Sequence, residues 1–168
     1  MTYLDTQPNN FNILRTNKFS LSFSRIPNMT YFCQTVTLPS LFVGGPILSG
    51  NLSDLQLPGD KLQTDAIQVT FLISEDLAGY KELYNWIVGI SFPDDFSQFR
   101  DLKAGDGEDS DAEIIVMSNN ENPLHKFQFE HVHIQTLGPI DFGTNIGEEP
   151  LICTASFSYQ IPFKIETF

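Results

Sequence analysis

The chain has 168 residues, of which 41% are hydrophobic and only 18% are charged. This length fits one domain with its own core, and the hydrophobic share is too low for a membrane protein. Nine Lys and Arg against 21 Asp and Glu give a net charge of −12, which leaves too few cations for a groove that grips nucleic acid. We therefore expect one domain over residues 1–168, with no signal peptide and no membrane span.

Apolar and polar residues alternate along most of the chain, and this period of two predicts β-strands. The first alternating run is followed by a turn at Pro27-Asn28 and a second run, so a hairpin is expected there. In the fifth run the apolar parity changes, which predicts a bulge near Glu130 to His131. In the last run the odd positions are apolar, so Phe157 and Tyr159 are expected in the core. The runs are Phe19 to Ser24, Tyr31 to Leu38, Ala66 to Ile73, Ala112 to Met117, Phe127 to Gln135 and Leu151 to Phe163.

Helical spacing occurs once, from Leu77 to Ile90, with Ser74 as the expected N-cap and an end before Pro93. This helix is expected to cover one face of the sheet. Two long loops are also predicted. Residues 41–63 contain four Gly and two Pro, which indicates an irregular or hairpin-like loop. The segment from Phe96 to Ala112 ends in the acidic stretch Asp106 to Asp111, so a solvated, mobile loop is expected at about 103–112.

Residues that could carry chemistry are scattered. Cys33 and Cys153 lie in strand patterns and are expected to be structural thiols. His125, His131 and His133 share parity but lack an obvious fourth ligand, so surface or interface histidines are the preferred interpretation. The acidic stretch does not fit a calcium loop. We therefore expect no enzymatic activity, no catalytic residue, no metal and no cofactor.

The polar side of the strands is small and uncharged, where exposed sheet faces usually carry Lys and Glu. Such a face suits the lining of a channel or packing against another polar surface. An ordinary exposed Ser/Thr-rich sheet remains the alternative. The channel-lining candidates are Ser20, Ser22, Ser24, Gln68, Thr70, Ser156 and Ser158.

The order of short motifs over residues 14–163 resembles the tail tube proteins of contractile-tailed bacteriophages. The sequence has a strand pair that ends in Thr37-Leu38-Pro39, a loop that closes with Leu57-Pro58-Gly59-Asp60, and an alternating strand before the helix. A strand, the turn at Asn119 to Pro123, and two further strands complete the order. The acidic stretch and the missing aromatic–Pro pair after Gln135 depart from the family pattern. They leave open whether the match is to a main tube subunit or to a baseplate tube initiator or cap protein.

The resemblance implies a mainly β fold, an antiparallel β-sandwich or barrel with one flanking α-helix. It implies six-membered rings that stack into a tube, through which DNA passes without specific binding. Partners would be further copies of the chain, tail sheath and baseplate proteins, and the location would be the virion tail, assembled in the host bacterial cytoplasm. Assembly would use the loop 41–63, with candidates Leu38, Pro39, Leu57, Pro58, Gly59 and Asp60. A glycan- or peptide-binding β-sandwich is the alternative from a different functional class.

Overall fold

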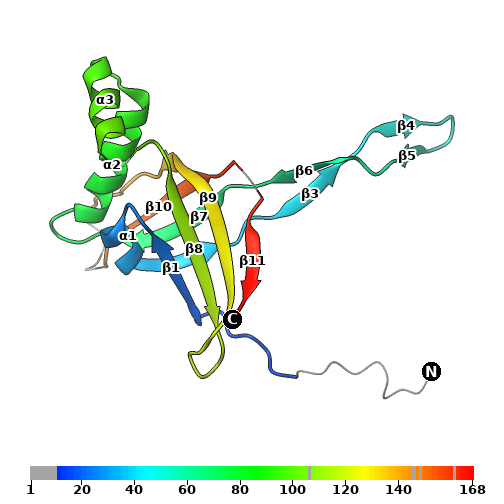
Figure 1. Ribbon diagram of the computed structural model, residues 1–168, viewed down its shortest axis with the longest axis horizontal. Helices are drawn as coiled ribbons and strands as arrows, with labels where there is room; N and C mark the ends of the chain where they lie inside the picture. The colour runs from blue at the N-terminus through cyan, green and yellow to red at the C-terminus, as the bar shows by residue number, and fades with distance from the viewer. Residues whose placement is uncertain (1–10, 106, 145–146, 148, 161) are drawn as a thin grey trace.

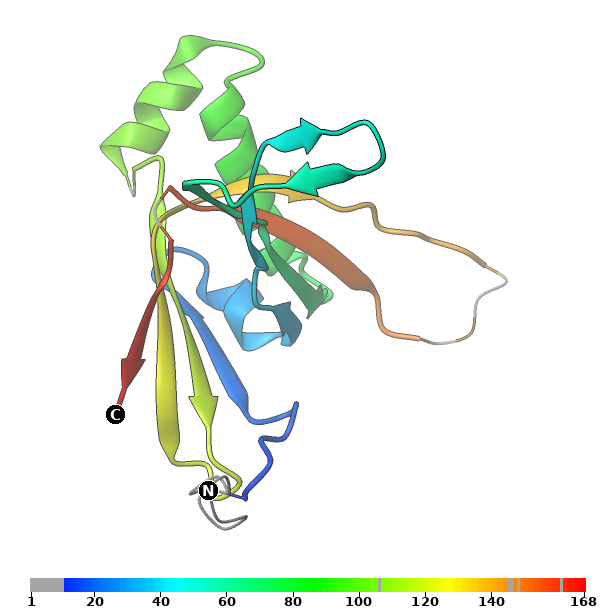
Figure 2. The same ribbon diagram turned by 90° about the vertical axis from the view of Figure 1, so that its right-hand side faces the viewer.

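The computed structural model describes residues 11–105, 107–144, 147, 149–160 and 162–168. Its main body is a seven-stranded antiparallel sheet in the order β1-β8-β9-β10-β7-β2, with β11 paired to β9. The sheet curls so that its two end strands, β1 and β2, approach each other (Figures 1 and 2). The expected mainly β, antiparallel fold is confirmed. The strands are β1 Phe19–Phe23, β2 Cys33–Thr37, β7 Ile67–Leu72, β8 Ser110–Met117, β9 Pro123–Leu137, β10 Ile152–Ser158 and β11 Lys164–Thr167.

Among the described residues, three helices accompany the sheet: α1 Pro27–Tyr31, α2 Ala78–Ser91 and α3 Phe96–Ala104. The predicted helix is confirmed as α2, which lies against the curled sheet, and α3 packs beside α2 (Figure 1). The predicted N-cap was wrong, because Leu77 caps α2 in a left-handed conformation with φ of 58°. Ser74 instead donates a hydrogen bond to Asp76, whose carboxylate accepts one from the backbone N–H of Ala78.

Two loop predictions were also wrong. The expected hairpin of the first two runs does not form, because Pro27 starts α1 and β1 pairs with β8 while β2 pairs with β7. Proline suits the first turn of a helix because its missing N–H would have had no helical partner. The predicted long loop from residue 96 is a helix as far as Ala104, and its acidic end already enters β8 at Ser110. Asp106 lies outside the described residues.

The core is formed by the inward-facing apolar residues of β1, β7, β8, β9 and β10 together with side chains of α1 and α2. Phe157 is fully buried, and its ring centroid lies 4.8 Å from that of Phe23 and 6.1 Å from that of Trp86. Tyr159 is also buried, as expected, whereas Ile161 lies outside the described residues. The predicted bulge is confirmed: the register of β8 with β9 shifts there, and His131 takes a φ of 54°. The inward residues of β7 and β10 are Ile67, Val69, Phe71, Cys153, Ala155 and Phe157.

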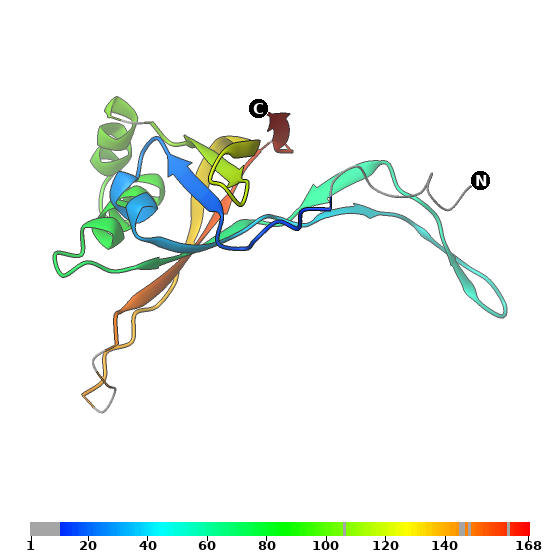
Figure 3. The same ribbon diagram turned by 90° about the horizontal axis from the view of Figure 1, so that it is seen from below.

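Residues 41–64 form a long two-part hairpin, which we call the hairpin arm. β3 (Leu41–Gly44) pairs with β6 (Lys61–Thr64), and farther out β4 (Ile47–Ser49) pairs with β5 (Asp54–Gln56). The hairpin arm extends the β2–β7 strand pair and projects away from the sheet (Figures 1 and 3). Between its two parts the backbones come so close that a Cβ on Gly59 would lie 1.6 Å from the Gly44 carbonyl oxygen. Of the two loop alternatives, the structure shows the hairpin.

We predict that Phe157→Ala destabilises the fold by about 3–5 kcal/mol, because a fully buried ring leaves a cavity that the sheet and α2 cannot close. Ile165→Ala in β11, where the side chain is 61% exposed, should change the free energy of unfolding by less than about 0.5 kcal/mol. Denaturant unfolding monitored by circular dichroism measures both. Equal effects of the two changes would contradict the assignment of Phe157 to the centre of the core.

Candidate functional site

The outward face of β2, β7, β10 and the end of β9 is polar and uncharged. Gln68 on β7 lies opposite Thr37 on β2 and Ser156 on β10, and Ser156 in turn lies opposite Thr136 on β9. A second row joins Thr35, Thr70 and Thr154. We call these seven residues the uncharged face. Sheet pairing therefore places Gln68, Thr70 and Ser156 on one surface. Ser158 lies two residues after Ser156 and therefore faces the same side of β10.

The serines of the first strand lie on a different surface. Ser20 is paired with Ile115 of β8, and Ser22 with Glu113. Across this surface Lys126 of β9 lies 3.3 Å from carboxylate oxygens of both Glu113 and Glu166. The outer face of β1, β8, β9 and β11 thus carries paired charges, unlike the uncharged face.

Ser24 follows β1, and its hydroxyl lies 2.9 Å from that of the buried Ser110. Thr35, Thr37, Thr136 and Thr154 were not among the channel-lining candidates, but they belong to the uncharged face with Gln68, Thr70 and Ser156. An alternating Thr pattern at 35 and 37 was the available signal for the first two.

The assembly-loop candidates lie at two levels of the hairpin arm. Leu38 and the buried Pro39 are at its base, where Ser40 hydrogen-bonds Asp65 through both hydroxyl and backbone. The other four, residues 57–60, lie between β5 and β6 at the close backbone approach. A Cβ on Gly45 would lie 1.8 Å from the Leu57 carbonyl oxygen, so the Pro-Gly-Asp motif marks a place where two backbones touch.

The hairpin arm carries large apolar side chains that are exposed to solvent in the single chain. Two-stranded hairpins are marginally stable in water without further packing, and contiguous apolar patches of this kind mark interaction sites. The hairpin arm therefore has the surface of an element that packs against a partner. Its exposed apolar residues, each at least 47% accessible, are Leu41, Phe42, Val43, Ile47, Leu48, Leu52, Leu55 and Leu62.

The thiols and two of the histidines have structural surroundings. Burial raises the pKa of the Cys33 thiol to about 11, and burial also raises the pKa of Cys153. His125 lies 3.2 Å from the hydroxyl of Thr167, and His131 hydrogen-bonds Asp109. Among the described residues, no group of three or more His, Cys, Asp or Glu could hold a metal ion. Within the same part of the chain, no helix is long and apolar enough to cross a membrane.

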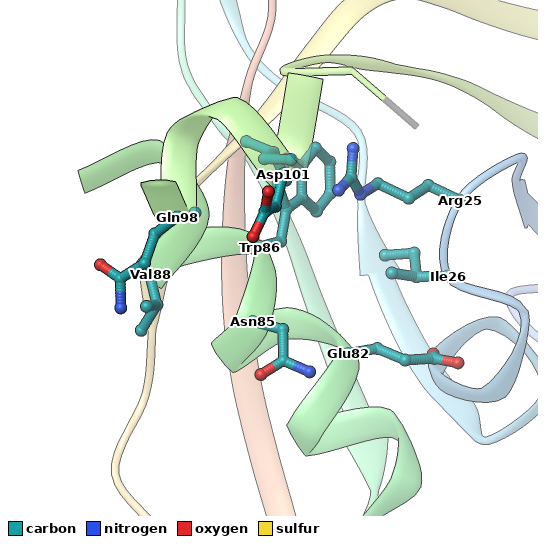
Figure 4. Close-up of a pocket in the computed structure, with 10 residues that line it drawn as sticks. Arg25, Ile26, Glu82, Asn85, Trp86, Val88, Gln98 and Asp101 are labelled. Atoms are coloured by element: carbon teal, nitrogen blue, oxygen red, sulfur yellow. The ribbon is translucent and has the colours of Figure 1, made fainter. Parts of the chain in front are cut away.

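A pocket of about 410 Å³ lies between α2, α3 and the segment after β1 (Figure 4). The Arg25 guanidinium stacks over the Trp86 ring at 4.9 Å, and the Trp86 indole N–H donates to the Glu108 carbonyl oxygen at 2.9 Å. Glu82 accepts a hydrogen bond from Asn28 at 2.5 Å. These contacts join α2 to α1 and to the segment between α3 and β8, which gives the pocket walls a structural role.

No protein-family model matches the sequence, and no curated protein matches it either. Solved structures do match. The tube-terminating cap of the anti-feeding prophage aligns with a TM-score of 0.62 at 12% identity, covering 100% of both chains. The sheath–tube complex of an extracellular contractile injection system, PVC, gives 0.59 at 11% identity over 93% of each chain.

Hcp1 from Flavobacterium johnsoniae gives a TM-score of 0.50 at 18% identity, covering 88% of this chain and 92% of that one. The chain has the tube-protein fold. The fold expected from the resemblance to phage tail tube proteins is confirmed by these structures. At this identity the match is one of fold, so the role of the chain has to be argued from its own surfaces.

We predict that the His131–Asp109 pair makes stability depend on pH. The hydrogen bond and charge of Asp109 raise the pKa of His131 from its ordinary 6.5, and His131 lowers the pKa of Asp109 from its ordinary 3.8. The His131 contribution is complete below pH 6.5 and is lost as pH rises through the raised pKa. The Asp109 contribution is complete above pH 3.8 and is lost as pH falls through the lowered pKa.

His131→Asn removes the charge, and Asn tolerates the positive φ of the bulge. Wild type should exceed this variant in stability at about pH 5, and the difference should shrink by about pH 9. Denaturant midpoints at the two pH values measure it, with His125→Asn as a matched control that should show no such trend. A difference that is the same at both values would contradict a charged pair.

Proposed function

We propose that the chain is a structural, non-enzymatic subunit that assembles with further copies into rings, and that these rings stack into the tube of a contractile, phage-tail-like particle. The observation that carries the proposal is the position of two surfaces on one strand pair: β2 and β7 hold four of the seven residues of the uncharged face and continue directly into the apolar hairpin arm. A tube subunit needs one surface that lines the channel and another that contacts the next copy, and we assign these roles to the uncharged face and the hairpin arm.

The uncharged face supports a channel-lining role. The seven side chains of its two rows are neutral, while the chain as a whole carries a net charge of −12. A polyanion that passes such a wall meets no cation to hold it, and binding to DNA depends on phosphate contacts from Lys and Arg. We infer that DNA passes along this face during ejection without specific binding.

The partners and place follow from the same proposal. Sheath and baseplate proteins would contact the assembled tube in the tail of the particle, which would be built in the cytoplasm of a host bacterium. The shared fold serves a tube in one similar structure and a terminating cap in another, so a baseplate initiator or cap is the second candidate of the same class. Stacked tubes from the isolated chain would favour the main tube subunit, and single rings would favour a cap or initiator.

We predict that purified wild-type protein forms six-fold rings or tubes and that shortening the hairpin arm prevents this. The backbone N–H of Leu57 donates to the Pro46 carbonyl oxygen at 3.0 Å, so residues 47–56 can be replaced by an Asn-Gly turn between these two residues. The removed strands carry exposed apolar residues and pair only with each other. The variant should therefore stay folded and remain monomeric.

Negative-stain imaging with mass measurement tests both forms of the protein. A control in which the solvated turn residues Asn51 and Ser53 are changed to Ala should still assemble. Rings or tubes from the shortened variant would contradict an assembly role of the hairpin arm. A wild-type chain that stays monomeric and binds glycans would instead favour the sugar-binding alternative.

We predict that Gln68→Arg with Ser156→Arg makes assembled tubes bind duplex DNA, because each new cation adds a salt-dependent phosphate contact. The two positions lie directly opposite each other on β7 and β10. The matched control is Ser22→Arg with Gln128→Arg, which flank Glu113 on the face that already holds paired charges. Fluorescence anisotropy at low and high salt should detect binding only for the first pair, and equal binding by both pairs would contradict the assignment of the uncharged face to the channel.

A further inference from the structure

The two end strands of the sheet face each other across a groove of about 930 Å³ with a mixed apolar and polar lining, which we call the β1–β2 groove. Within the described part of the chain, β1 pairs only with β8 and β2 only with β7, so each strand turns one unpaired edge toward this groove. Val36, Val116 and Phe127 line it, and the rim carries Tyr31, which is 84% exposed. Unpaired strand edges beside apolar side chains form a template for an added strand.

The same molecule carries an element with the complementary surface. The hairpin arm is built of strands and exposes apolar side chains along its length. It projects away from the body that contains the groove, so its outer part lies far from its own β1–β2 groove (Figures 1 and 3). Only the hairpin arm of another copy can bring this surface to the groove.

Charge favours the same pairing. The charged residues that line the β1–β2 groove are the two cations Arg15 and Lys18, of which Lys18 forms an ion pair with Glu121 at 2.5 Å. The hairpin arm carries the acids Asp54 and Asp60 and the single cation Lys61. An apolar contact between the two would therefore bring opposite charges together at its rim, which fixes register and steers association.

We propose that the hairpin arm of a second copy lies in the β1–β2 groove and covers its apolar lining and the two unpaired strand edges. The contact joins two different surfaces, and such a contact repeats from copy to copy until the chain of subunits closes into a ring or continues as a stack. The proposal rests on the self-assembly proposed above and names the surface that receives the hairpin arm.

A pair of cysteines tests the contact directly. Tyr31→Cys places an accessible thiol at the rim of the groove, and Leu48→Cys places one on the hairpin arm, where Leu48 is 55% exposed. Both changes are made in a Cys33→Ser background, since Cys33 also lines the groove; Cys153 is buried. Tyr84→Cys with Leu48→Cys is the matched control, because Tyr84 is an exposed tyrosine on α2, which does not line the groove.

Equal amounts of unlabelled and ¹⁵N-labelled protein are mixed, assembled and treated with a short bis-maleimide, and the linked peptides are read by mass spectrometry. We expect linked peptides of mixed isotope content for the pair at 31 and 48, and none above background for the pair at 84 and 48. Links between different copies give mixed and unmixed peptides in about equal amounts, so linked peptides that are all unmixed would show that the hairpin arm reaches its own groove and would overturn the proposal.

The outcomes separate this proposal from the proposed function. Rings or tubes without the 31–48 link would overturn the groove contact and leave the tube subunit standing. Linked pairs of chains without rings or tubes would support the groove contact and count against the tube subunit. Neither assembly nor link would overturn both.

A charge at the rim provides an independent measurement. Tyr31→Asp should keep the circular dichroism of the wild type, because the changed side chain is exposed, and should lose assembly by imaging. Tyr84→Asp should retain assembly. Normal assembly of the Tyr31→Asp variant would overturn the proposal, because an acid at the rim would lie against the apolar and acidic hairpin arm.

Discussion

The register between β7 and β10 is the constraint on which the rest of the structure depends. Gln68 lies opposite Ser156 and Val69 opposite Ala155, so the two alternating strands place their buried apolar residues on one side and their small polar residues on the other, where Leu72 and Ile152 are the apolar exceptions at one end. A slip of one residue would exchange the two faces along a whole strand. The buried aromatic residues favour this register, because it places Phe157 against Phe23 and Trp86 in the core. The core thereby also fixes which side chains form the uncharged face.

The hairpin arm continues the direction of the strand pair β2–β7, and its apolar side chains are left uncovered in the single chain. β2 and β7 run on into β3 and β6, and the exposed leucines of the arm contribute to a surface that is unfavourable in water. Only 18% of the residues are charged, below the share of about 25% in ordinary globular domains. The proposed self-assembly would explain both the low charge content and the apolar arm, because other copies would then cover much of the surface of the chain.

Sequence patterns predicted the secondary structure that depends on neighbouring residues. They failed to predict the strand pairing, which depends on segments that are distant in the sequence. Strand alternation, α2 and the bulge near His131 follow from local periodicity, and the structure has all three. The pairing partner of β1 could not be predicted from local periodicity. Pro27 is compatible with a hairpin turn as well as with the first residue of α1, and β8 is distant from β1 in the sequence. α3 was missed because its apolar residues Phe96, Phe99 and Leu102 form a short pattern beside charged residues. For the candidate site, parity assigned each residue to a side of its own strand, but only the pairing of strands separates Ser20 and Ser22 from Gln68 and Ser156.

The distribution of charge bears on how a wall of this kind could let a polyanion pass. Several acids lie away from the uncharged face: Glu113 and Glu166 are paired with Lys126 on another part of the sheet, and Asp109 is paired with His131. Asp65, in contrast, lies beside Thr37 and Gln68. At physiological salt a charge is screened beyond about 8 Å, so distant acids contribute little to repulsion at the wall. At short range, apart from Asp65, the wall consists of Thr, Ser and Gln side chains, which can exchange hydrogen bonds with water and offer phosphate no positive charge. On this argument smooth passage depends less on the net charge of the subunit than on the absence of Lys and Arg from the two rows of the uncharged face.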